Sequence, residues 1–336
     1  MTENAPTATV HEVAHAAGVS PATVSRILNG SARVSDAKRR AVEQAIAQLN
    51  YRPNLLAQSL KSGRAMTIGI LTPDVVSPFF TESLRGIEAA LVGTGYAPLI
   101  VSGHWRPDEE SNRVELLIAR RVDGIVILSG GLTESQIASY AQRIPIVATG
   151  HQLRANRALG ITFDQYQGAR MAMQHLIEMG HQRIAFIAGL VGHGDAKARL
   201  QGYEDALAAA GIAFDPQLVV QGNFLENGGI LAVNLLLEAH QQFSAIFAAN
   251  DHTAYGARLA LYRRGIRVPE DVSVIGFDDL PASSYVTPPL TTIRQPVFEA
   301  GRVAAQSLLH LIRGESVAVP SLALELIVRE SVKCLR

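Results

Sequence analysis

The chain has 336 residues, of which 48% are hydrophobic and 18% are charged, and this composition favours a globular protein of two or three domains. The net charge is zero, but residues 1–64 hold eight Lys and Arg against four acids, an excess expected of a small nucleic-acid module on a mildly acidic body. The lone Cys334 cannot form an internal disulfide, the N-terminus lacks a signal-peptide pattern, and no apolar run approaches the ~20 residues of a membrane span, so we expect a cytoplasmic protein.

Residues 9–29 predict two short helices joined by a tight turn. Thr9 and Glu12 have the spacing of a capping box, and Gly18 can end the first helix in a left-handed conformation. Ser20 and Pro21 are suited to the start of the second helix. The apolar positions that should face inward are Val10, Val13, Ala14, Ala17, Val24, Ile27 and Leu28.

The second helix, expected over 22–28, leaves a small, polar and basic outer face. That face is made by Ala22, Thr23, Ser25, Arg26 and Asn29. A short helix with such a face and a hydroxyl-rich start suits insertion into the major groove of DNA. The alternative is an ordinary helical hairpin in a protein core, because two-helix patterns are common.

A third helix is expected over 37–49, capped by Ser35 and ended by Asn50. Its inner stripe consists of Ala41, Val42, Ala45, Ile46 and Leu49. The chain then breaks at 52–54, and 55–61 reads as one or two helical turns without a core of their own. A segment this short is not stable alone in water, so we expect it to order only against something else.

From Met66 onward, short apolar runs alternate with amphipathic helical segments. Strands are expected over 68–71, 99–101, 124–128, 144–148, 159–163, 184–188, 218–220, 245–249 and 272–277. Helices are expected over 79–93, 109–121, 134–142, 165–179, 196–210, 227–238 and 252–264. This alternation indicates an α/β fold of parallel sheets flanked by helices, and the length favours two subdomains.

The runs VAHAAGVSPATVSRILN and LNYRPNLLAQSL resemble the headpiece of the lactose-repressor family of bacterial transcription regulators. The likeness continues through TPDVVSPFF, RVDGIVIL, GHQRIAFIAG, AIFAAND and RVPEDVSVIGFDD. It implies a helix-turn-helix headpiece over 1–53, a hinge helix and linker over 54–64, and an effector-binding core over 65–336. The core would be two-lobed and periplasmic-binding-protein-like, with lobes formed by 65–163 with 294–321 and by 164–293 with 322–336.

The resemblance implies that residues of the headpiece contact DNA. Ala22 and Arg26 should read base edges, and Pro21 can offer only apolar contact. Phosphate contacts are expected from His11, Ser20, Thr23, Ser25, Asn29 and Ser35. Leu60 matches the hinge leucine that wedges into the minor groove at the centre of a palindrome, and Asn54 would cap the hinge helix. Packing of Leu60 against the core is the alternative.

Effector contacts should lie beyond the carboxyl ends of the strands. Arg199, Asn250 and Asp278 match effector-contacting residues of the family, and their donors and acceptors suit sugar hydroxyls. The weaker candidates are His151, His193, Asp195, the aromatics Phe79, Phe80 and Phe224, and Asp164. For these, a surface position, core packing or helix capping is the alternative. Asp251 is expected to cap the helix that follows it.

The position of Gly150 and His151 departs from purine-binding members, which carry an acidic residue followed by an aromatic there. This departure disfavours a purine effector, and the polar residues Arg199, Asn250 and Asp278 together with the phenylalanines favour a sugar, a sugar phosphate or a sugar acid. The chain has no trailing heptad repeat, so we expect a homodimer on palindromic operator DNA.

Two other classes of protein must be weighed. Residues 11–15 read HEVAH, the HExxH string of zinc proteases, but Glu12 has a capping role and no third ligand suggests itself. No other catalytic set is evident, so we expect neither an enzyme nor a cofactor. A solute-binding protein built on the same lobes is the second alternative, disfavoured by the headpiece.

Overall fold

The structure is a computed structural model that describes residues 8–28, 34–51 and 64–335. The chain forms two compact units, Met1–Ala65 and Met66–Arg336, which are described separately. The predictions for Asn29, Asn54, Leu60 and most of the hinge fall outside the described residues.

The first unit holds three helices, α1 (Val10–Ala16), α2 (Pro21–Leu28) and α3 (Asp36–Gln48). They enclose a small core of Val13, Ala14, Val24, Val42 and Ala45. The predicted capping box is confirmed, because Thr9 N donates to Glu12 Oε2 at 2.6 Å and Glu12 N donates to Thr9 Oγ1 at 3.4 Å. Gly18 has the predicted left-handed backbone, with φ of 63°.

The start of α3 differs from the prediction in one respect. Ser35 occupies the N-cap, but its side chain makes no capping hydrogen bond, so the predicted hydroxyl cap is wrong. Asp36 in the first turn instead places a negative charge at the positive end of the helix dipole.

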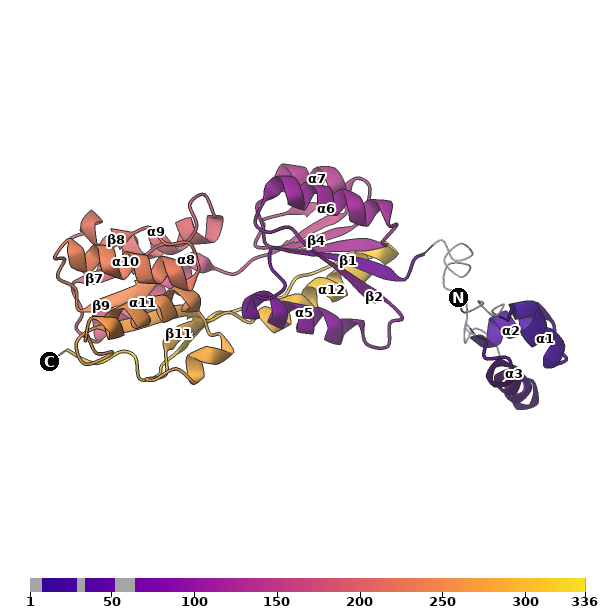
Figure 1. The fold of residues 1–336 in the computed structure, drawn as a ribbon. Coiled ribbons are helices and arrows are strands. Elements are labelled where there is room, and N and C mark those ends of the chain that lie inside the picture. The colour runs from indigo at the N-terminus through magenta and orange to yellow at the C-terminus, as the bar shows by residue number, and fades with distance from the viewer. Residues whose placement is uncertain (1–7, 29–33, 52–63, 336) are drawn as a thin grey trace, which may run out of the picture. The chain divides into compact units, whose positions relative to one another are not determined.

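The second unit contains two lobes, each built on a six-stranded sheet. In the first lobe the strand order is β2-β1-β3-β4-β6-β5. The strands are β1 (Thr67–Thr72), β2 (Ala97–Ser102), β3 (Gly124–Leu128), β4 (Ile146–Thr149), β5 (Arg154–Ala155) and β6 (Ala158–Ile161). The helices are α5 (Pro78–Leu91), α6 (Pro107–Ala119), α7 (Glu134–Ala141) and α12 (Val297–Arg313). Figure 1 shows α12 beside α5 in this lobe.

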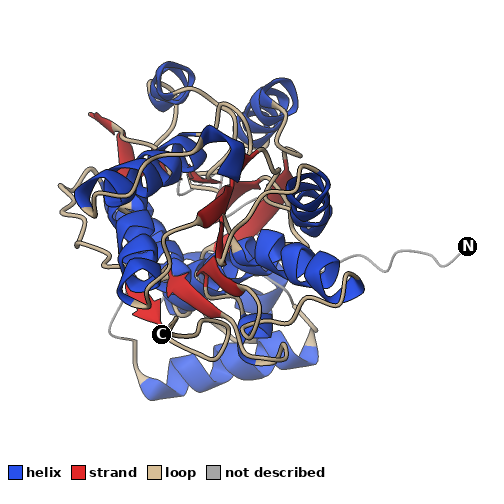
Figure 2. Ribbon diagram, turned by 90° about the vertical axis from the view of Figure 1, so that its left-hand side faces the viewer, coloured by secondary structure: helices blue, strands red, loops and turns tan. Residues whose placement is uncertain are grey.

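The second lobe repeats the scheme, with the order β12-β11-β10-β9-β7-β8. Its strands are β7 (Ile184–Ile187), β8 (Val219–Val220), β9 (Ala245–Ala248), β10 (Ser273–Asp278), β11 (Thr291–Arg294) and β12 (Glu325–Ile327). Its helices are α8 (Gln165–Glu178), α9 (Gly194–Ala209), α10 (Glu226–Glu238) and α11 (Asp251–Arg263). Helices lie on both faces of the strands (Figure 2), which is why β3, β7 and β9 are buried along their whole length.

The chain passes between the lobes at three places. It leaves the first lobe between β6 and α8, returns between β11 and α12, and leaves again between α12 and β12. In both sheets the strand order reverses next to the first strand of the lobe, at β1 and at β7. Ligands of doubly wound folds bind at such reversals, beyond the carboxyl ends of the strands.

Candidate effector-binding and DNA-binding sites

Arg199 and Asp278 form a buried pair at the carboxyl ends of the second sheet. Arg199 comes from the first turns of α9, and Asp278 is the last residue of β10. Both side chains are buried, and Arg199 Nη2 lies 3.9 Å from Asp278 Oδ1. The guanidinium also covers the ring of Phe277, 3.8 Å from its centroid. A buried cation stacked on an aromatic ring is held in one orientation, as a recognition site requires.

Two glutamines connect the members of this pair through a chain of hydrogen bonds, and the 3.9 Å ion pair between Arg199 and Asp278 closes the chain into a ring. Gln165 Oε1 accepts from Arg199 Nε at 3.0 Å and from Nη2 at 2.8 Å. Gln165 Nε2 donates to Gln295 Oε1 at 2.9 Å, and Gln295 Nε2 donates to Asp278 Oδ1 at 2.7 Å. Arg199 Nη1 additionally donates to the carbonyl of Ala249 at the end of β9. Sequence reasoning did not select either glutamine.

The electrostatics of the pair are set by burial. Burial raises the pKa of Asp278 to about 7, although the nearby Arg199 opposes the shift. Burial also lowers the pKa of Arg199. A carboxyl group that titrates near neutrality can donate or accept a hydrogen bond, which suits recognition of a hydroxylated ligand.

Asn250, and not Asp251, caps α11. Asn250 is the N-cap of α11, where its Oδ1 accepts from Thr253 N at 3.0 Å and its Nδ2 donates to the Phe224 carbonyl at 3.0 Å. The prediction that Asp251 caps this helix is wrong. The fully buried Asp251 carboxylate instead accepts from Leu280 N, Ser283 Oγ and Thr292 Oγ1 at 2.6 to 2.8 Å, and burial raises its pKa to about 6.

A row of aromatic rings runs from the first lobe to the second. Phe80 lies 5.8 Å from Trp105, Trp105 lies 5.5 Å from His193, and His193 lies 5.6 Å from Phe224, centroid to centroid. Phe80 and Trp105 belong to the first lobe, whereas His193 precedes α9 in the second. Arg199 continues the row, 5.7 Å from the Phe224 ring. These contacts therefore form one continuous row between the lobes, and Trp105 was not predicted.

His151 and His193 carry ring nitrogens that have no partner within the protein, among the described residues. Burial lowers the pKa of both histidines, and the negative charge of Asp195 partly opposes this shift in each of them. Within the described residues, His151 Nε2 and His193 Nδ1 are buried without a hydrogen-bond partner. Neutral imidazoles with an unused nitrogen can each donate to or accept from a ligand.

The remaining candidates have structural contacts. Phe80 is part of the first lobe's core, and Phe79 packs against that core. Asp164 is exposed and caps α8 by accepting from Gln167 N at 2.9 Å. These contacts agree with the core-packing and capping alternatives.

The outer face of α2 carries the predicted DNA-facing residues. Ala22 and Arg26 are exposed, and Arg26 Nε donates to the Ala22 carbonyl at 3.2 Å, which leaves the two Nη groups at the end of the side chain. Ser20 Oγ accepts from Thr23 N at 3.2 Å and so caps the helix as predicted. His11 and His15 are exposed on α1, and among the described residues no group of three or more metal-ligating side chains could hold an ion.

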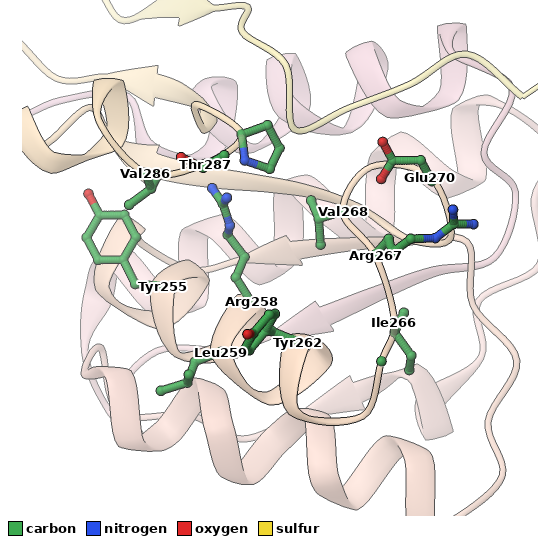
Figure 3. Close-up of a pocket in the computed structure, with 12 residues that line it drawn as sticks. Tyr255, Arg258, Leu259, Tyr262, Ile266, Arg267, Val268, Glu270, Val286 and Thr287 are labelled. Atoms are coloured by element: carbon green, nitrogen blue, oxygen red, sulfur yellow. The ribbon is translucent and has the colours of Figure 1, made fainter.

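Two surface hollows lie away from these residues. One, of about 620 Å³, lies between α11 and the segments around Val268 and Val286 (Figure 3). Arg258 reaches from α11 toward Thr287 there, and its Nη1 atom is buried without a partner among the described residues. The other, of about 500 Å³, lies beside β5 and the end of α12. Neither hollow contains a predicted effector residue.

A three-helix unit with a polar recognition helix, followed by two α/β lobes with a polar cluster at the strand ends, defines a ligand-responsive DNA-binding regulator. Residues 9–54 match the family of bacterial regulatory proteins called the lacI family. Residues 65–327 match the family of periplasmic binding proteins and sugar-binding domains of the LacI family. The chain belongs to the LacI family of DNA-binding transcriptional repressors, which are regulators and not enzymes.

Known members resemble the chain over nearly its whole length. The transcriptional repressor PurR of Haemophilus influenzae is 36% identical over 333 residues, covering 97% of this chain and 99% of PurR. The repressor CytR of Escherichia coli is 36% identical, covering 98% of this chain and 97% of CytR. Among solved structures, the lac repressor dimer bound to operator and the anti-inducer ONPF superposes with a TM-score of 0.86 at 29% identity, covering 97% of this chain and 99% of the lac repressor chain. Within the described residues, no helix is long and apolar enough to cross a membrane.

Proposed function

We propose that the chain represses carbohydrate-metabolism genes and that a small sugar-like effector controls its affinity for operator DNA. The observation that carries this proposal is the buried Arg199–Asp278 pair at the carboxyl ends of the second sheet. A cation and a carboxyl group held side by side offer donors and acceptors to neighbouring hydroxyls. The solved CelR–cellobiose complex, with a TM-score of 0.71 at 35% identity, covering 96% of this chain and 99% of that chain, is a relative whose ligand is a sugar.

The effector contacts that we propose are divided between polar and aromatic residues. Arg199 and Asp278 bind hydroxyls, and Asn250 contributes its remaining amide hydrogen, because its other polar positions are engaged within the protein. Phe224 and Phe79 offer ring surfaces, and Phe80 packs edge-on against Phe79. His151, His193, Asp195 and Asp164 are the remaining proposed contacts.

The DNA contacts that we propose lie on α2 and its neighbours. Ala22 and Arg26 face the base edges, with Pro21 as an apolar contact. The phosphate contacts are His11, Ser20, Thr23, Ser25, Asn29 and Ser35, and the hinge contacts are Asn54 and Leu60. The lac repressor dimer bound to operator supports the same use of this unit. We further infer that the protein acts in the cytoplasm, on nucleoid DNA.

We propose a homodimer as the active form, in which each headpiece reads half of a palindrome. Its domains would be the headpiece 1–53, the hinge 54–64, and lobes of 65–163 with 294–321 and of 164–293 with 322–336. A face of α11 supports the dimer, because Leu259 and Tyr262 are exposed there beside the hollow of Figure 3. Large apolar side chains gathered on a surface are typical of an interface.

Selection of binding sites from randomised duplexes tests the DNA-binding part. We expect the full chain to enrich a palindrome, with an affinity that falls steeply as salt rises. Arg26→Ala should weaken that binding by about 1–3 kcal/mol and relax the preference at one position of each half-site. Arg39→Ala, which removes the same charge from the exposed face of α3, is the matched control. Failure to enrich any sequence, with folded protein, would favour a solute-binding protein.

A further inference from the structure

The ring that Arg199 and Asp278 form with Gln165 and Gln295 consists of hydrogen bonds and one ion pair, and both glutamines lie at connections between the lobes. Gln165 is the first residue of α8, directly after the chain has crossed from the first lobe. Gln295 lies between β11 and α12, where the chain crosses back. The two crossings are therefore joined side chain to side chain, by the 2.9 Å bond from Gln165 Nε2 to Gln295 Oε1.

The side-chain oxygen and nitrogen of both glutamines take part in the ring. Gln165 Oε1 accepts twice from Arg199, and Gln295 Nε2 donates to Asp278 at 2.7 Å. Gln165 is 7% exposed and Gln295 is 3% exposed, so water does not readily replace either amide. A buried network that is fully paired is rigid, and removing one member leaves its neighbours unpaired.

Asp279, which follows Asp278 in the chain, has no recorded hydrogen bond to Gln165 or Gln295 and has different partners. Asp279 Oδ2 accepts from Arg294 Nε at 2.7 Å, and its Oδ1 accepts from Arg329 Nη2 at 2.6 Å. Asp278 and Asp279 have φ of 115° and 56°, and this sharp turn sends the two side chains to different partners. Asp279 is thereby committed to two arginines of its own lobe, whereas Asp278 reaches Arg199 and Gln295.

We propose that Gln165 and Gln295 are positioning residues that couple the Arg199–Asp278 pair to the angle between the lobes. When a ligand moves Arg199 or Asp278, the ring transmits the displacement to both crossings, and a change in lobe angle moves the pair in return. The inference rests on the proposed function, because it takes the pair as the place where the effector acts. Coupling requires a two-state element that both sites bias. We take the angle between the lobes, which the crossings allow to change, as that element.

The chain carries its own probes for a test. Trp105 is the only tryptophan and lies in the first lobe. Cys334 is the only cysteine, it is exposed, and the next residue anchors it to the second lobe through a 2.7 Å bond from Leu335 N to the Met179 carbonyl. A naphthalene-sulfonate acceptor on Cys334 makes the distance from Trp105 measurable by time-resolved energy transfer in the full-length protein. No DNA and no effector are needed.

Gln295→Met and Gln165→Met remove the amides and keep side chains of similar length. We expect each variant to widen the distribution of Trp105–Cys334 distances roughly twofold, and the double variant to widen it no further, because either change opens the same ring. Gln167→Met is the matched control, since Gln167 is exposed in the same turn of α8. Widths equal to that of the control in both single variants would overturn the proposal.

Gln295→Glu separates coupling from a loss of packing, and it serves also if the methionine variants fail to fold. At about pH 5 a shared proton restores the bond to Asp278, whereas at about pH 8 the two carboxylates repel each other. We expect a narrow distribution at the lower pH and a wide one at the higher pH. Arg199, Asp251 and Asp195 also act on Asp278, so the wild-type protein is measured at both pH values. A width of Gln295→Glu that does not change with pH would contradict coupling.

The outcome is independent of DNA binding. A protein that enriches no duplex but shows the widened distributions would overturn the proposed function and leave the mechanical link intact. A protein that binds a palindrome, with distributions unchanged in Gln165→Met, Gln295→Met and Gln295→Glu, would overturn the link alone.

Discussion

At the scale of single residues, the site depends on which polar atoms are already engaged. Asn250 matches a family effector contact, yet most of its amide is used to cap α11 and to hold the Phe224 carbonyl. Asp251 next to it has three internal donors and serves the junction of α11, β10 and β11. Asp278 keeps one oxygen outside the ring, which makes it the residue of this group best placed to meet a ligand.

The raised pKa of Asp278 gives a prediction with a definite sign. The group titrates near 3.8 when unfolded and at about 7 when folded, so its ionisation costs stability increasingly between these values and fully above the upper one. Asp278→Asn removes this cost. We expect the variant's gain in unfolding free energy, relative to wild type, to be about 2 kcal/mol larger near pH 8 than near pH 5.

Denaturant unfolding at the two pH values measures this difference. Asp164→Asn is the control, because that side chain is exposed and Asn caps a helix as well as Asp does. An Asp278→Asn difference that is independent of pH would mean that Asp278 does not carry the predicted titration.

Site residues can be predicted from the sequence where they follow or end a predicted strand. They are missed where only the folded chain brings them to the site. Arg199 and Asp278 follow or end strands of one lobe, and the family likeness identified them. Gln165 and Gln295 are 130 positions apart and meet only because the chain crosses between lobes twice. Trp105 joins the row of rings through a contact with His193 of the other lobe, which no local pattern in its own segment announces.

At the scale of elements, α12 shows what periodicity alone does not reveal. Apart from the hinge helix, which lies outside the described residues, the predicted strands and helices up to residue 277 have counterparts in the structure, with ends shifted by a few residues. The sequence pattern predicts no strand or helix after residue 277, although the structure has β11, α12 and β12 there. Periodicity does not place α12 in a lobe, whereas the family resemblance assigns 294–321 to the first lobe, and there Ala300, Val303, Ala304 and Leu308 of α12 are part of the core.

Two glycines allow α12 to approach α5 closely. A Cβ atom on Gly301 would lie 2.0 Å from the Ser83 carbonyl oxygen, and one on Gly86 would lie 1.9 Å from that of Phe298. Backbone atoms cannot move aside as a flexible side chain could. We therefore expect Gly301→Ala to lower the free energy of unfolding by about 2–3 kcal/mol, since overpacking forces the helices apart.

Thermal and denaturant unfolding check this prediction. Gly194→Ala is a matched control, because Gly194 begins α9 and a Cβ atom there would have nothing within 4 Å. That substitution should leave stability unchanged or raise it by about 0.4–1 kcal/mol. Equal effects of the two substitutions would contradict the close approach of the helices.

At the scale of the whole molecule, two copies of the chain are needed to read a palindrome. We expect Tyr262→Asp to weaken self-association by at least about tenfold, because Tyr262 is 79% exposed on the proposed interface and its replacement would bury a charge. Sedimentation analysis measures the change. Val191→Asp, at a residue 80% exposed in the loop before α9, is the control. A monomer–dimer equilibrium that Tyr262→Asp does not alter would place the interface elsewhere.

The most direct test of effector control is the operator affinity of the full-length protein with and without a ligand of the proposed effector site. A thermal-shift screen of sugars, sugar phosphates, sugar acids, nucleosides and purines supplies the ligand, because binding to the native state raises the melting temperature. We predict that a sugar-like hit changes operator affinity about 5- to 150-fold in wild type, and that Arg199→Ala and Asp278→Ala abolish both the thermal shift and the change. A hit that shifts wild type and both variants equally would contradict the assignment of the effector site to this pair.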